Sequence, residues 1–388
     1  MSILDIRQWN YPTRIVFGLG AIERLPGLCG SFGMKRPLLV TDAGLADADI
    51  TGRTLDLLKN EGIEVAVFSD VKGNPTASNM EAGIEAYRSG GHDSVIAFGG
   101  GSGLDAAKTI AFMSKQTLPV WHFDDAGPGW KDANADDLPP VIAIPTTAGT
   151  GSEVGRASVI SNEETREKKI IFHPGMMPAV ALCDPELTRG LPAHLTAATG
   201  FDALVHCFEA FCAPGYHPFA DGIALEGMRL AGEHLPRAVA DGNDMEARAQ
   251  MMAVAAMGAT AFQKGLGGVH ALSHAIGALY DTHHGLTNAV VMPYVVQANR
   301  DAIEERMNLV SRMLDLEGSG FDAVFHWLLE LRSEVGIPHK ATELGVDAAQ
   351  AQELGARAVK DPTAAGNPIQ FAPAQYAAIL EKACSGTL

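Results

Sequence analysis

Residues 94–113 read SVIAFGGGSGLDAAKTIAFM and join three local patterns in one stretch. The first five residues form an apolar run of strand length, which is typical of a strand buried on both faces. Three glycines and Ser102 follow directly, and the pattern is helical from Leu104. Glycines between a strand and a helix let backbone N–H groups approach a phosphate at the helix N-terminus. The stretch therefore predicts a β–loop–α unit that can bind a nucleotide, with a pair of plain tight turns as the alternative.

Similar strand-length apolar runs lie on both sides of this unit. Segments 54–61 and 78–89 separate them with helical spacing. The strand-like runs are 37–40, 64–68, 94–98 and 141–144. Strands that alternate with helices predict a parallel sheet with helices on its faces. The acidic, Gly- and Pro-containing stretch 124–140 is expected to be an exposed loop.

The pattern changes after Gly190 and Pro192. Long segments rich in Ala, Met, Leu and His follow, with helical periodicity and no convincing strand. The clearest are 195–212, 219–235, 245–262 and 304–314. A chain of 388 residues also exceeds the size that one hydrophobic core usually serves. We therefore predict an α/β dinucleotide-binding domain over 1–191 and an all-helical metal-binding and catalytic domain over 192–388.

The amino-acid composition limits the classes of binding partner and the cellular compartments that we expect for this protein. With 29 basic and 46 acidic residues the formal net charge is −17, which disfavours nucleic acid and anionic membranes as partners. The N-terminus lacks the apolar core of a signal peptide, and the most apolar run, 251–262, is too short to span a bilayer. Five scattered cysteines without a CxxC pair indicate a reducing environment. We expect a soluble, cytoplasmic protein.

A second loop at a strand end strengthens the case for a nucleotide. The run 141–144 leads into PTTAGTGSE at 145–153, which offers small hydroxyls and flexible backbone where α/β sheets bind ligands. Asp42 follows another strand and could accept hydrogen bonds from ribose, which favours NAD over NADP; a turn aspartate or helix cap is the alternative. Because Asp42 precedes the glycine loop, the arrangement differs from the common GxGxxG order. Gly18-Leu19-Gly20 lacks a third glycine and is assigned no phosphate.

The helical half contains a candidate metal site. Asp202 and His206 are four residues apart, which places them on one helix face, and His270 and His274 repeat this spacing. His-His-Gly follows at 283–285. A single histidine is more often a packing residue, but an unpaired imidazole in such apolar surroundings is costly. One carboxylate with three imidazoles suits Fe²⁺ or Zn²⁺ and leaves positions open for substrate.

With these motifs the sequence resembles the iron-containing alcohol dehydrogenase family over nearly its whole length. The matching segments are 17–21, 74–76, 99–105, 145–153, 199–206, 265–274, 284–285, 336–338 and 367–368. PTTAGTGSE together with the spaced histidines is highly specific. The resemblance implies the dehydroquinate-synthase-like fold of that family, an α/β NAD domain followed by a helical domain, with the site in the cleft between them. It also implies a homodimer.

The resemblance also implies roles for individual residues. The expected metal ligands, for Fe²⁺ first and Zn²⁺ as the other option, are Asp202, His206, His270 and His284. His284 is preferred to His283 for its following glycine, and His274 is the expected unligated catalytic histidine near the nicotinamide. One of Lys168 and Lys169 should contact the cofactor. The other expected NAD contacts are Asp42, Gly99, Gly100, Gly101, Ser102, Asp105, Thr146, Thr147 and Thr150.

These residues predict hydride transfer between NAD(H) and a small alcohol or aldehyde. A divalent cation lowers the pKa of a bound alcohol, and His274 could relay the proton. Short primary alcohols, diols and hydroxyacids such as 4-hydroxybutyrate all fit as substrates. The alternatives are a zinc glycerol-dehydrogenase-like enzyme, a dehydroquinate-synthase-like lyase, a non-redox metal hydrolase and a non-catalytic nucleotide-binding protein.

Overall fold

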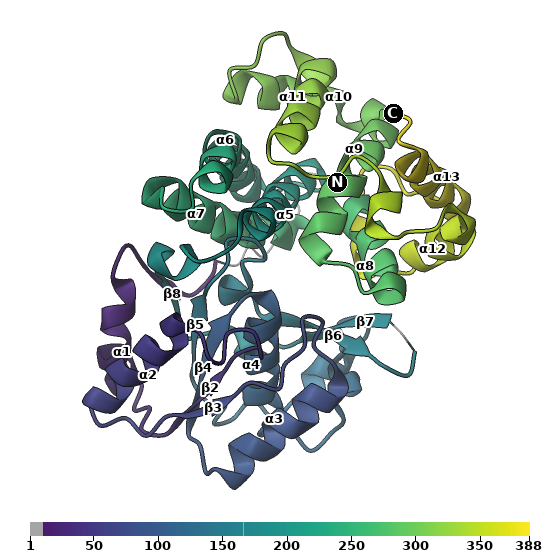
Figure 1. Cartoon of the computed structure of the whole chain (residues 1–388). Coiled ribbons are helices and arrows are strands. Elements are labelled where there is room, and N and C mark those ends of the chain that lie inside the picture. Colours follow the sequence, from purple (N-terminus) through teal and green to yellow (C-terminus); the bar gives the residue numbers. More distant parts are fainter. Residues whose placement is uncertain (1–10, 166) are drawn as a thin grey trace. The chain divides into compact units, whose positions relative to one another are not determined.

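The chain forms two compact units in the computed structural model, which describes residues 11–165 and 167–388 (Figure 1). One unit comprises 12–147 and 151–189 and has an α/β architecture. The other comprises 190–388 with Tyr11 and the short segment 148–150, and it is helical. The predicted fold class is thereby confirmed. No helix in the described part of the chain is both long and apolar enough to cross a membrane.

The α/β unit is built on a six-stranded, all-parallel sheet with the order β1-β8-β5-β4-β2-β3. Its strands are β1 (Arg14–Phe17), β2 (Pro37–Val40), β3 (Ala66–Phe68), β4 (Ser94–Gly99), β5 (Val141–Pro145) and β8 (Val180–Cys183). The four strands expected from apolar runs are all present, and β3 begins two residues later than predicted. Strands β1 and β8 were not predicted.

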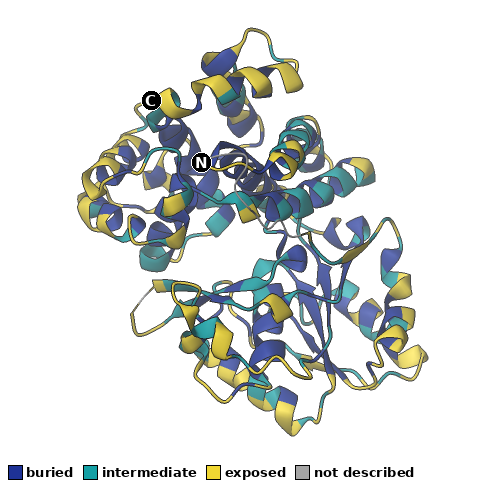
Figure 2. Cartoon of the chain, turned by 180° about the vertical axis from the view of Figure 1, so that it is seen from behind, coloured by how far each residue is buried: buried dark blue, intermediate teal, exposed yellow. Residues whose placement is uncertain are grey.

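Helices cover both faces of this sheet. Successive side chains of a strand point to opposite faces, so Leu38 and Val40 pack with α3 and α4, whereas Leu39 packs with α1 and α2. The buried strands are dark blue in Figure 2. The four helices are α1 (Leu25–Ser31), α2 (Asp49–Asn60), α3 (Ala77–Ser89) and α4 (Gly101–Met113). Helix α2 begins five residues before the predicted segment.

An antiparallel hairpin, which was not predicted, leaves the sheet after β5. Its strands are β6 (Ala157–Asn162), in which Ser158 and Ile160 are buried, and β7 (Glu167–Phe172), in which Ile171 is buried. Helix α4 holds the hairpin, because one carboxylate oxygen of Asp105 accepts the Val159 N–H at 2.8 Å. The buried Lys108 ammonium ion lies 3.2 Å from the other Asp105 oxygen and donates to the carbonyls of Ser152 and Ala157. The segment 124–140 is mostly exposed and contains only a short 3-10 turn, Pro128–Asp132.

The helical unit is organised around α5, which is buried along most of its length and contacts α6, α7 and α9. Its helices are α5 (Ala193–Cys212), α6 (Pro218–Ala240), α7 (Met245–Ala261), α8 (Gly268–Tyr280), α9 (His284–Ala298), α10 (Arg300–Met313), α11 (Gly320–Glu334), α12 (Ala351–Ala358) and α13 (Pro373–Ser385). A helix that is apolar all round belongs in the interior of a domain. Polar side chains on α5 therefore need partners inside the protein.

Candidate functional site

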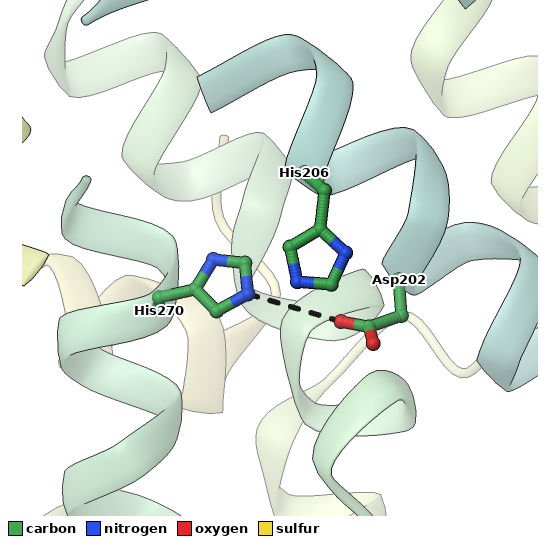
Figure 3. Close-up of side chains that lie close together, drawn as sticks. All are labelled: Asp202, His206 and His270. Carbon is green, nitrogen blue, oxygen red and sulfur yellow. Dashed lines mark ion pairs between the residues drawn. The ribbon is translucent and has the colours of Figure 1, made fainter. Parts of the chain in front are cut away.

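Three of the predicted metal ligands meet inside the helical unit. Asp202 and His206 project from one face of α5, and His270 reaches them from the first turn of α8 (Figure 3). One potential ligand atom from each of the three lies within 4.8 Å of the others, and all three side chains are buried. The Nε2 atom of His270 is 3.9 Å from Asp202 Oδ1. Two ligands of one tetrahedral zinc ion are separated by about 3.4 Å, so a single cation can bridge this cluster.

The fourth predicted ligand lies beside this group. His284 is the first residue of α9, and its Nε2 atom is 3.7 Å from the same Asp202 oxygen. Its Nδ1 atom is 3.1 Å from the Ser273 hydroxyl, which fixes the ring. The neighbouring His283 is exposed and caps α9 instead, because its Nδ1 accepts the Leu286 N–H at 3.3 Å. The geometry thus favours His284 over His283 as the ligand.

Glu209, which sequence reasoning missed, orients His270. It lies on the same face of α5 as Asp202 and His206, and its carboxylate accepts the N–H groups of Gly267 and Val269 at 2.9 and 2.7 Å. It also accepts the Nδ1–H of His270 at 2.7 Å. Burial lowers the pKa of His270, but the hydrogen bond and charge of Glu209 raise it overall. This carboxylate–imidazole pairing is the usual support of a metal-binding histidine.

The protonation state of His206 suits a metal ligand. Burial lowers the pKa of His206 to about 4, although the charge of Asp202 opposes this shift. The imidazole is therefore neutral near pH 7 and has a free lone pair. A buried carboxylate with neutral imidazoles is a donor set for divalent iron or zinc. Cys207, on the next position of α5, is buried and its pKa is raised to about 12 by that burial, so it stays a thiol.

His274 pairs with a residue from a distant part of the chain. Its Nδ1 atom is 2.8 Å from Asp361 Oδ2, and Asp361 also accepts the hydroxyl and N–H of Thr363 at 2.5 and 2.9 Å. Burial opposes ionisation of Asp361, but His274 and Thr363 lower its pKa overall. The ring of His274 stacks on that of His284 with 5.2 Å between centroids. Asp361 is 87 residues from His274 in the sequence, so no local sequence pattern predicts that the two are paired.

The loops after β2, β4 and β5 lie side by side in the α/β unit, because these strands are neighbours in the sheet. Gly99 has a φ of +145°, and a Cβ there would lie 3.5 Å from Asp42 Oδ2. The Thr146 N–H donates to the Gly99 carbonyl at 2.9 Å, which joins two of the loops. Oδ1 of Asp42 accepts the Gly44 N–H at 2.9 Å. Asp42 is thus a turn aspartate whose second oxygen faces the glycine loop.

Other predicted cofactor residues have partners of their own. The Ser102 hydroxyl donates to the Gly73 carbonyl at 2.5 Å. Asp105 accepts the Ser152 hydroxyl at 2.5 Å in addition to its contacts with the hairpin, which fits a role in holding the loop 145–153. Thr147 packs beside Gly100, whereas Thr150 belongs to the segment that groups with the helical unit. A cofactor contact for these residues stays a prediction.

The two candidate lysines occupy opposite faces of β7. Lys169 pairs directly with the buried Ile160 of β6, and its ammonium ion lies 3.2 Å from Asp124 and 3.5 Å from Glu167. Lys168 lies on the other face of the hairpin, at a half-exposed position. Gly18-Leu19-Gly20 is not a phosphate loop in this structure, since the Gly20 N–H donates to the Asp184 carboxylate at 3.3 Å.

Comparisons with known proteins agree along the whole chain. Residues 12–185 match the family described as iron-containing alcohol dehydrogenase, and residues 196–384 match its C-terminal domain family. The chain belongs to the iron-containing alcohol dehydrogenase family. It is 40% identical to 4-hydroxybutyrate dehydrogenase of Cupriavidus necator over 383 residues, which covers 96% of this chain and 98% of the relative. The expected family and the expected activity, an NAD-linked alcohol dehydrogenase, are thereby confirmed.

Solved structures support the same conclusion for this alcohol dehydrogenase. A crystal structure of 1,3-propanediol oxidoreductase has a TM-score of 0.91 and 34% identity, and the match covers 97% of this chain and 100% of that one. Sulfoacetaldehyde reductase from Bifidobacterium kashiwanohense, in complex with NAD⁺, has a TM-score of 0.88 and 27% identity, covering 98% and 99%. The fold of both units is therefore that of a dehydrogenase family.

The Glu209 contact gives a prediction about metal affinity. In Glu209→Gln the amide keeps the size of the side chain but loses the charge that supports His270. We expect the Zn²⁺ affinity to fall by about 10- to 100-fold, as measured by competition with a chromophoric chelator. Glu226→Gln is the control, because Glu226 only pairs with Arg229 at the surface of α6. Equal affinities in the two variants would show that Glu209 does not support the site.

Proposed function

We propose that this enzyme binds one divalent cation, Fe²⁺ in preference to Zn²⁺, through Asp202, His206, His270 and His284. The observation that carries the proposal is the buried cluster of one carboxylate and imidazoles at a spacing that one ion can bridge. Few structural reasons exist to bury such a group without a cation, because each buried polar atom requires a partner. The family name supports iron.

The reaction we propose is hydride transfer between NAD(H) and a small alcohol or aldehyde. A bound divalent cation would polarise the substrate oxygen and make loss of the alcohol proton easier. His274 would accept that proton. Asp361 accepts a hydrogen bond from Nδ1–H of His274, so Nε2 takes up the proton during oxidation and returns it during reduction. Asp361 is then a positioning residue that fixes the tautomer.

We assign the cofactor to the loops after β2, β4 and β5. Backbone N–H groups of Gly99–Ser102 at the start of α4 suit the pyrophosphate, and Thr146 and Thr147 supply hydroxyls beside them. Asp42 suits the adenosine ribose and would repel a 2′-phosphate, so NAD is the proposed cofactor. The NAD⁺ complex of the sulfoacetaldehyde reductase supports this assignment. One of Lys168 and Lys169, which lie on opposite faces of β7, is the proposed lysine contact of the cofactor.

Substrate class and assembly follow from other observations. Relatives that act on 4-hydroxybutyrate and on 1,3-propanediol support a short hydroxyacid or diol, with simple primary alcohols beside them. A homodimer is supported by the edge strand β1, which carries the exposed apolar residues Ile15 and Phe17 and is followed by the exposed Leu19. The five buried free cysteines fit a reducing cytoplasm.

The metal assignment is tested by His270→Ala. We expect this variant to retain its fold but to lose bound metal and turnover, since only three of the four proposed ligands then remain. Protein stripped of metal and reconstituted anaerobically with Fe²⁺ or Zn²⁺ is assayed for NADH oxidation with succinic semialdehyde, 3-hydroxypropanal and butanal. His326→Ala, an exposed histidine paired with Glu330 on α11, is the control. Full activity of stripped His270→Ala would refute the proposal.

Cofactor choice is tested at Asp42. Removing its charge in Asp42→Gly is expected to raise the kcat/KM ratio of NADP to NAD by about tenfold or more, because the repulsion of a 2′-phosphate disappears. Asp47→Gly removes an equal charge from an exposed position of the same loop. If the ratio is the same in the two variants, Asp42 does not set the preference.

The contribution of each lysine is tested by a matched pair of variants. Replacement by Met of the lysine that contacts the cofactor is expected to raise the KM for NADH by about tenfold, the usual effect of losing a hydrogen bond from a charged group. Lys169→Met also breaks the contacts with Asp124 and Glu167, so it is expected to lower the thermal stability as well. An unchanged KM for NADH in both Lys168→Met and Lys169→Met would remove both lysines from the cofactor site.

A further inference from the structure

We propose that Asn288 is a fifth protein group of the cation site, an inference that rests on the function proposed above. Asn288 lies on α9 one turn after His284 and is fully buried. Its Nδ2 atom lies 2.7 Å from Asp202 Oδ1. The same nitrogen lies 3.2 Å from His270 Nε2 and 3.1 Å from His284 Nε2. The side-chain amide therefore contacts three of the four proposed ligand atoms.

At this position the amide nitrogen of Asn288 partly replaces a cation, because its N–H groups interact with the ligand lone pairs. Its two N–H groups carry partial positive charge and satisfy lone pairs that would otherwise be buried without a partner. The contact keeps Asp202, His270 and His284 directed at one point. A lone pair that accepts an N–H cannot bind a metal at the same time, so the nitrogen must leave these atoms when a cation enters.

The other end of the amide, the carbonyl oxygen, can take a cation as its partner. Asn288 Oδ1 is buried and has no hydrogen-bond partner among residues 11–165 and 167–388. A half turn about the terminal torsion, which is broad and two-fold for asparagine, exchanges the two ends. The carbonyl oxygen then faces the ligand atoms, where a cation stabilises it. Asn288 thus holds the ligands through nitrogen before metal binding and contacts the cation through oxygen afterwards.

A second buried asparagine in the same unit shows what a purely structural amide looks like here. Asn299 follows the last residue of α9, and both ends of its amide pair with Asn367, each at 2.9 Å. Its oxygen also accepts the Ile369 N–H. Asn299 is therefore satisfied at both ends, whereas Asn288 is satisfied only at the end that faces the ligands. This difference separates an amide that stabilises the fold from one with spare capacity for a ligand.

The experiment measures metal affinity in three variants of the full-length, metal-stripped protein. Zn²⁺ dissociation constants come from competition with a chromophoric chelator, and the absorption spectrum of the Co²⁺ form reports the coordination. Asn288→Leu removes both ends of the amide at similar volume, and we expect the dissociation constant to rise by about 10- to 100-fold. Asn288→Asp keeps an oxygen at the same place, and we expect affinity at least equal to that of the wild type. Asn299→Leu is the control, expected to stay within about twofold even if its Tm falls.

The variants distinguish the possible failures. Unchanged affinity and an unchanged Co²⁺ spectrum in Asn288→Leu would overturn the inference and leave the proposed metal site intact. Weakened binding in Asn288→Asp would show that the amide acts only as an N–H donor, which also overturns it. This second variant keeps the test decisive if Asn288→Leu does not fold. A wild type that binds no Zn²⁺, or a His270→Ala variant that binds it equally well, would instead refute the metal site itself.

Discussion

The helical unit depends on burying two carboxylates, Asp202 and Glu209, in a helix that is mostly apolar. A buried anion without partners is too costly for a marginally stable domain, so other elements must bring donors to α5. The start of α8 brings two backbone N–H groups and the ring of His270 to Glu209. Helix α9 brings Asn288 and His284 to Asp202. The positions of α8 and α9 against α5 are consequences of these contacts as much as of apolar packing.

Two glycines allow this approach. A Cβ on Gly285 would lie 2.5 Å from the Ala198 carbonyl and 3.0 Å from the Asp202 Cβ, so any larger residue would move α9 away from the carboxylate. A Cβ on Gly267 would lie 2.9 Å from a Glu209 oxygen. The motif glycines therefore serve the same site as the histidines. His284 and His270 supply the ligands, and Gly285 and Gly267 let the helices that carry them approach α5 closely enough.

Much of the fold was predictable, because long segments with periodic apolar residues indicate their secondary structure. Helix α5 and strand β4 lie within two residues of their predicted bounds. Strand β1 was missed because its apolar run covers only three residues, Ile15 to Phe17, and the hairpin β6–β7 was missed because charged residues interrupt its pattern. The order of Asp42 before the glycine loop was unusual in the sequence, but β2 and β4 are neighbours in the sheet, which brings their loops together whatever their order along the chain.

Helical spacing in the sequence could identify only those site residues that lie on the same helix face. Asp202 and His206 are one turn apart, and the same spacing would have found Glu209 one turn beyond His206 and Asn288 one turn beyond His284. They were overlooked because a glutamate or an asparagine on a helix usually faces solvent, and only the packing of α5 and α9 shows that these two are buried. Asp361 could not be found in this way, since a turn before α13 brings it to His274.

Spare hydrogen-bonding capacity distinguishes the candidate site from two structural polar clusters of this chain. The Asn299–Asn367 pair and the Asp105–Lys108 cluster use their donors and acceptors within the protein, and both hold elements together. Asn288, beside the proposed ligands, keeps a buried oxygen without a partner among the described residues. An unsatisfied polar atom destabilises a fold, so its retention beside the proposed ligands favours a binding role. The same reasoning explains why two of the four proposed ligands, Asp202 and His206, lie on the buried helix α5, whose packing keeps their lone pairs directed at one point.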